Sequence, residues 1–129
     1  MSVINRISTL REVSEVAATS GEFGFALKDF LDGFYASPNA ADLTDAPPPL
    51  ATALSDGVRL DAYLAAVAER LSREHRWAVP SWTRDPSRYL ETPWFGMQSH
   101  GARMILLEKS PAAFRVRNIF VSANALSRV

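Results

Sequence analysis

The sequence predicts a mainly α-helical fold, with three principal amphipathic helices, short helices that begin at prolines, and the option of a small two-stranded element near the C-terminus. Apolar residues recur at three- and four-residue intervals in three long segments. Several prolines directly follow Asp, Thr or Ser, which are residue types that cap helix N-termini. One short segment near the end of the chain is rich in β-branched and aromatic residues.

Length and composition predict one helical domain over residues 1–129. A chain of this length buries roughly two thirds of its unfolded surface. The chain has no cysteine, which excludes disulfides and thiolate metal sites. Polar residues interrupt the apolar residues of segment 1–16, so we expect neither a signal peptide nor a membrane span, and we expect a cytoplasmic protein.

The charges are unevenly distributed although 14 basic residues balance 14 acidic ones. Residues 1–64 carry four basic and nine acidic residues, whereas residues 65–129 carry ten basic and five acidic ones. Either the two halves attract each other within the fold, or a basic surface meets an acidic partner or a nucleic acid. A net charge of zero argues against strong non-specific nucleic-acid binding, so nucleic acid is not the expected partner.

The first half contains two predicted helices. Residues 3–17 form the first, and Ser20 is placed to cap the second. The second helix carries one continuous apolar stripe and ends near Gly33 and Ser37-Pro38. The residues of this stripe are Phe23, Leu27, Phe30, Leu31 and Phe34.

Residues 38–57 form a proline-rich connector with its stiffest point at Pro47-Pro48-Pro49. Three consecutive prolines favour an extended conformation, which suits either a plain connector between helices or a ligand for a proline-reading module. Residues 58–75 follow as the third and strongest helix, which repeats the stripe of the second. Its apolar positions are Leu60, Leu64, Val67, Ala68 and Leu71.

The prolines of the second half mark predicted helix starts rather than helix breaks. Asp85-Pro86, Thr92-Pro93 and Ser110-Pro111 each pair a capping residue with proline at the first helical position, and Ser37-Pro38 is a fourth candidate. We therefore expect a helical turn in "DPSRYL", another in "TPWF", and about two turns in "SPAAFRV".

Two segments beyond residue 96 could contribute strands. The apolar run 104–107 is too short for its periodicity to distinguish helix from strand. Residues 117–121, "RNIFV", have the composition of a strand. If both are strands, they would form a two-stranded element, and Ser122 would then cap a final turn.

All three tryptophans lie within residues 77–95, beside arginines. They either fill the core next to irregular chain or stay partly exposed as anchors of an interface, where Trp, Tyr and Arg are enriched. On the second interpretation, the candidate partner-binding residues are Trp82, Arg84, Arg88, Trp94, Arg115 and Arg117.

Evidence for catalysis or metal binding is sparse. The two histidines, His75 and His100, lie in no known metal-binding pattern, and no phosphate-binding loop or nucleophile elbow is present. Arg70 and His75 form an R-x4-H pattern that resembles the ribonuclease motif of HEPN-domain toxins. This resemblance implies Arg70 as a stabiliser of phosphoryl charge and His75 as a proton carrier. The alternative is a solvated helix end whose cations complement the helix dipole.

A second resemblance covers roughly residues 23–129. The motifs "AERL", "PSWT", "PWF" and "SPAAFRVRNIFV", in this order, resemble those of a group of small bacterial proteins. Members of the group are often encoded beside nucleotidyltransferase-like toxins. The resemblance implies an antitoxin, or an accessory subunit of a toxin–antitoxin pair.

The leading hypothesis is a non-enzymatic protein-binding module that restrains a nucleotidyltransferase-like toxin, with no cofactor and no metal. A homodimer remains open. The alternatives are a HEPN-like ribonuclease that uses Arg70 and His75, and a regulator that binds nucleic acid.

Overall fold

The computed structural model describes residues 7–97, 99–122 and 126. The predicted helix residues 3–6 and most of the turn predicted after Ser122 lie outside this part of the chain. The described helices, 3-10 turns and strands are, in order, α1 (Leu10–Ser20), α2 (Phe23–Ala36), η1 (Ala40–Leu43), α3 (Gly57–Glu74), η2 (Ser81–Arg84), η3 (Pro86–Arg88), β1 (Trp94–Phe95), α4 (His100–Lys109), α5 (Ala112–Arg115) and β2 (Ile119–Phe120).

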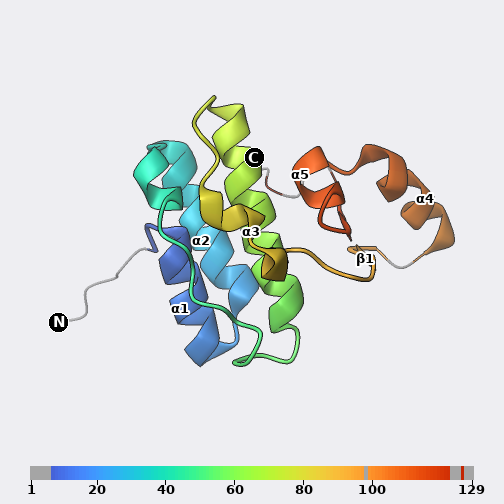
Figure 1. Ribbon diagram of the computed structural model, residues 1–129, viewed down its shortest axis with the longest axis horizontal. Helices are drawn as coiled ribbons and strands as arrows, with labels where there is room; N and C mark the ends of the chain where they lie inside the picture. The colour runs from blue at the N-terminus through green and yellow to red at the C-terminus, as the bar shows by residue number, and fades with distance from the viewer. Residues whose placement is uncertain (1–6, 98, 123–125, 127–129) are drawn as a thin grey trace.

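The fold class is as predicted: mainly helical, with one small parallel two-stranded sheet. α1, α2 and α3 form a three-helix body, and α4, α5 and the strands lie to one side of it (Figure 1). The predicted stripes of α2 and α3 are buried in a shared core with residues of α1. We name residues 94–122, which run from β1 through α4 and α5 to just past β2, the C-terminal arm.

α1 begins at Leu10 because the preceding residue closes a capping box. The Thr9 hydroxyl accepts a hydrogen bond from the backbone N–H of Glu12, and the Glu12 carboxylate accepts one from the backbone N–H of Thr9. The helix ends at Gly21, whose left-handed φ of 74° favours glycine. Ser20 is the last residue of α1 and not the N-cap of α2, so that expectation was wrong.

The proline-rich connector is fixed against the body. The Asp61 carboxylate on α3 accepts hydrogen bonds from the backbone N–H groups of Leu50 and Ala51. The carbonyls of Pro47 and Pro48 accept hydrogen bonds from Arg88 and Ser14. These hydrogen bonds hold residues 47–51 against α1, α3 and η3.

Gly57 permits the connector to approach the start of α3. A Cβ atom at this position would lie 1.8 Å from the carbonyl oxygen of Leu50, a separation that no real contact allows. Glycine is therefore required by space and not by an unusual backbone angle.

The two-stranded sheet forms, but one of its strands was predicted as a helical turn. β2 lies within "RNIFV", as expected, and its partner is β1, with Trp94 paired to Ile119. "TPWF" is therefore extended, because the Trp94 N–H donates to the carbonyl of Asn118 and not to its own helical turn. Residues 104–107 are part of α4 and not a strand.

The rule that proline marks a helix start holds once among the short segments. Asp85 caps η3 by accepting a hydrogen bond from the Ser87 N–H, with Pro86 as the first residue of the turn. Ser110 instead ends α4, since its hydroxyl donates to the carbonyl of Leu106, and α5 is a single turn. Ser37 likewise ends α2 and does not begin a new helix.

Within the described residues, no helix is both long and apolar enough to span a bilayer.

Candidate partner-binding surface

The six predicted contact residues do not form one exposed face. Arg88 and Arg117 are buried, so they are not available to a partner at the surface. Trp82 and Trp94 are partly buried and pack against the core. Only Arg84 and Arg115 are exposed.

Arg88 joins η3 to α3 and to the connector. Its guanidinium donates to the carbonyls of Pro47 (2.7 Å) and Asp61 (3.3 Å) and lies 3.7 Å from the Asp61 carboxylate. Burial raises the pKa of Asp61, although the N–H donors of the connector and the charge of Arg88 oppose the shift. Burial likewise lowers the pKa of Arg88. The expected contact residue therefore stabilises the fold.

Arg117 has the same kind of role in the arm. Its guanidinium donates to the Glu69 carboxylate of α3 at 2.6 Å and to the carbonyls of Ala113 and Thr83 at 2.8 Å each. The guanidinium carbon also lies 4.7 Å from the centre of the Tyr89 ring. Because a buried charge must be paired, Arg117 joins the arm to the body, and its side chain is not exposed at the surface.

All three tryptophans are partly buried and pack against the core. The Trp82 indole donates its N–H to the Leu43 carbonyl at 3.0 Å, which fastens η2 to η1. The Trp77 ring packs edge-on against Phe34 and stacks on His75. Both side chains remain partly exposed but are held by contacts within the chain.

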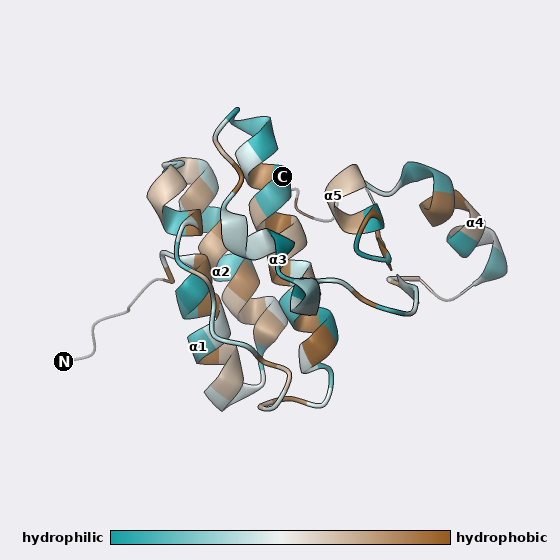
Figure 2. Ribbon diagram, viewed as in Figure 1, coloured by the Kyte–Doolittle hydropathy of each residue, from teal (hydrophilic) through white to brown (hydrophobic). Residues whose placement is uncertain are grey.

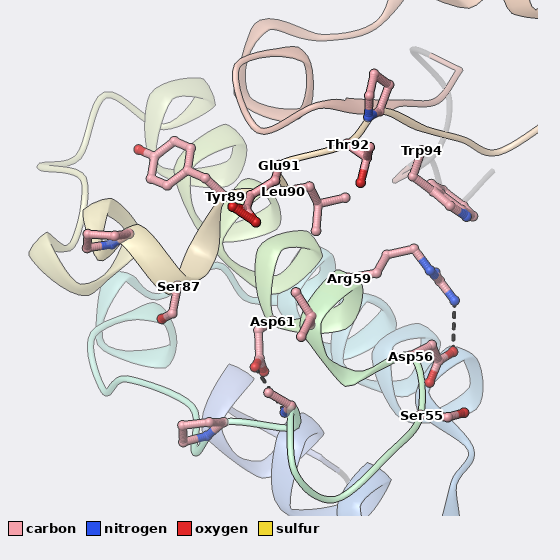
Figure 3. A pocket seen from close by; sticks show the side chains of 15 residues that line it. Ser55, Asp56, Arg59, Asp61, Ser87, Tyr89, Leu90, Glu91, Thr92 and Trp94 are labelled. Carbon is pink, nitrogen blue, oxygen red and sulfur yellow. Dashed lines mark hydrogen bonds and ion pairs between the residues drawn. The ribbon is translucent and has the colours of Figure 1, made fainter.

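Trp94 lines a groove between α3, the connector and the segment that leads to β1. The groove has a volume of about 810 Å³. The Arg59 guanidinium lies 4.4 Å from the centre of the Trp94 ring and pairs with Asp56 at 2.8 Å. Figure 3 shows Arg59 between these two side chains, with Glu91 and Thr92 above α3. The sequence did not indicate Arg59, because it meets Trp94 only in the folded chain.

The groove is lined by both charged and apolar side chains. Its Asp61 carboxylate is turned toward the backbone N–H groups of Leu50 and Ala51 (Figure 3). Across the described part of the chain, no three His, Asp or Glu side chains gather as metal ligands would.

The R-x4-H pattern does not converge on one point. Five positions along a helix separate Arg70 and His75 by about 140° around its axis. Arg70 pairs with Glu74 at 3.5 Å, whereas His75 stacks on Trp77 with ring centres 4.5 Å apart. The His75 Nδ1 atom also lies 2.9 Å from the carbonyl oxygen of Leu71.

The most exposed group of apolar side chains in the arm lies on α4. Only Leu106 is buried there, at 3% exposure, while Met104 (54%), Ile105 (61%) and Leu107 (43%) face solvent. Successive residues of a helix point about 100° apart, so four consecutive apolar residues surround the helix. One side packs on the arm and the other sides have no cover among the described residues. Figure 2 shows a hydrophobic stretch of α4 between hydrophilic ones.

α4 stands apart from the body, and local contacts stabilise its N-terminus and the segment beyond its C-terminus. The Ser99 hydroxyl caps its N-terminus by accepting a hydrogen bond from the Ala102 N–H at 3.2 Å. Beyond its C-terminus, Phe114 is fully buried, and its ring centre lies 5.0 Å from that of Tyr63 on α3. The apolar run and the Glu108-Lys109 pair that closes it were visible in the sequence, but its exposure was not.

The exposed charges around α4 are mainly positive. Arg103 lies over the Phe95 ring at 5.2 Å, and Lys109 and Arg115 are exposed. Glu108 is the one acidic residue of the arm. We name Met104, Ile105 and Leu107 together with these three cations the α4 surface.

Comparison with known proteins adds no assignment: no protein-family model, curated protein or solved structure matches the chain.

Proposed function

We propose that this chain is a non-enzymatic protein-binding module that docks on a partner protein and restrains it. The observation that carries the proposal is the exposure of Met104, Ile105 and Leu107 on α4, a helix that stands out from the three-helix body. An apolar group of this kind on an otherwise ordinary surface is typical of an interaction site. Burying the exposed half of each side chain would contribute about 1 kcal/mol per residue.

The fixed geometry of α4 favours binding further. Association costs conformational entropy for every side chain and loop that it must order. α4 is already helical with its N-terminus capped by Ser99, and the segment that follows it is anchored by Phe114 and by the Arg117–Glu69 pair, so part of that cost is met before binding. A preformed recognition helix suits stable inhibition better than transient contact.

For the partner we propose a nucleotidyltransferase-like toxin encoded beside this chain. The resemblance in the motifs "PSWT", "PWF" and "SPAAFRVRNIFV" supports this choice. The chain would then act as an antitoxin or an accessory subunit.

Co-expression tests the proposal. A tagged copy of the chain should retain the product of the adjacent gene through affinity purification and gel filtration. Its expression should also relieve any growth arrest that the product causes. Failure to form a complex at micromolar concentration would contradict the proposal. Lys28→Glu changes an exposed residue of α2 and serves as a control that should retain the complex.

A further inference from the structure

We infer that the partner receives α4 in an apolar groove bordered by carboxylates. This inference rests on the proposed protein-binding function and adds the chemistry of the surface that meets α4. Its starting point is the arrangement of apolar and charged side chains on the α4 surface.

The apolar part calls for a concave partner surface. Met104 and Leu107 are one helical turn apart and share a face, and Ile105 lies beside them. An isolated flat contact would leave part of this wide apolar sector in water. A groove would remove all three side chains from water at once, as in other complexes in which a helix binds in a groove.

The charged part specifies the border of the groove. Arg103, which lies over the Phe95 ring, and Lys109 are exposed on α4, Arg115 is exposed on α5, and Glu108, one turn after Met104, is the single acidic residue of the arm. Carboxylates on the partner would complement this excess and accelerate association. A groove bordered by lysines or arginines would instead repel the positive charges of the α4 surface.

The same charges argue against a second copy of the chain as the occupant of this surface. A two-fold pairing of α4 with itself would bring two net-positive surfaces together. The apolar contact would rest on three side chains from each copy, Met104, Ile105 and Leu107. Stable interfaces bury about 800 Å² per partner, which is more than such a pairing of short helices provides.

A photo-crosslinking experiment tests the inference. The photoreactive residue p-benzoylphenylalanine replaces Met104 in the full-length chain, which is expressed in its native host and irradiated. We expect one dominant adduct with a different protein. Its crosslinked peptide should map to an apolar groove with Asp or Glu at its edge.

Variants of the chain that carries the photoreactive residue distinguish the contribution of the charged border from that of the apolar groove. Lys109→Glu with Arg115→Glu should reduce the adduct about tenfold, because two attractions become repulsions, and added salt should weaken the unaltered complex. Lys28→Glu with Arg76→Glu makes the same change in net charge on exposed positions outside the arm and should leave the adduct intact. Leu107→Asp should reduce it at least thirtyfold.

Each other outcome overturns the inference. These outcomes are no adduct, an adduct with a second copy of the chain, an adduct that both pairs of charge reversals affect equally, and a partner groove without carboxylates. If the adjacent gene product co-purifies and Leu107→Asp leaves that complex unchanged, the inference fails while the proposed function stands. If an acidic groove of another protein is crosslinked instead, the toxin assignment fails and the inference stands.

Discussion

The Arg117 guanidinium donates to the Glu69 carboxylate across 2.6 Å, joining the C-terminal arm to α3 with both groups largely removed from water. The same guanidinium satisfies the backbone carbonyls of Thr83 and Ala113. One side chain therefore holds η2, α3 and the arm together, and four predictions test this arrangement and its surroundings.

Arg117→Met should lower the free energy of unfolding by about 3 kcal/mol, because it leaves the Glu69 carboxylate without its buried partner. Chemical denaturation followed by circular dichroism measures the change. Arg115→Met, two residues away and exposed, should stay within about 0.5 kcal/mol of the unaltered chain. Equal losses in the two variants would contradict the structural role of Arg117.

Glu69→Gln should make stability less sensitive to acid. Burial raises the pKa of Glu69, but hydrogen bonds and charge from Arg117 and Arg73 outweigh it, so the pKa lies below its usual value. The carboxylate therefore contributes stability above its unfolded pKa of about 4.3, and this contribution is lost as the pH falls through the lower folded value.

The difference in free energy of unfolding between the unaltered chain and Glu69→Gln is thus expected to be full at pH 7 and to shrink below pH ~4.3. Urea titrations from pH 7 to pH 2.5 measure it. A difference that grows on acidification would show that the sign is wrong.

Gly57→Ala should destabilise the protein by about 2 kcal/mol or more, since its methyl group would overlap the carbonyl of Leu50. Gly24→Ala is the matched control. It lies in the first turn of α2 with no atom near the added Cβ, so it should leave stability unchanged or raise it slightly. Thermal unfolding of both variants compares them, and a tolerated Gly57→Ala would refute the close approach.

Leu106→Ala should cost about 2 kcal/mol, whereas Ile105→Ala should cost less than about 0.5 kcal/mol, although the two residues are adjacent in α4. The difference follows from their exposure of 3% and 61%. Denaturation of each variant measures it. A larger loss of stability in Ile105→Ala than in Leu106→Ala would show that Ile105, and not Leu106, is the buried residue.

Periodicity sufficed for the three-helix body because each helix buries a single stripe, and the stripe is a property of the local sequence. It failed where distant residues decide the conformation. Trp94 is extended because Asn118, more than twenty residues later, accepts its N–H. Composition also could not distinguish the buried Arg88 and Arg117 from the exposed Arg84 and Arg115, since burial depends on which carbonyls and carboxylates the fold brings near.

The candidate site was visible only in part for the same reason. The apolar run of α4 can be found in the sequence, but four consecutive apolar residues are equally consistent with a core helix or a strand. Its exposure depends on the position of α4 in the folded chain, in the segment that connects the paired strands β1 and β2.

That pairing has an evolutionary consequence. Parallel strands require a crossover between them, and in this chain the crossover is the segment that carries α4. Within this crossover Phe114 and Arg117 contact α3, whereas α4 adds no residue to the core cluster of the described residues, so a change in length confined to α4 would leave the packing of the three-helix scaffold intact. Evolutionary change in the crossover is therefore expected to concentrate in α4.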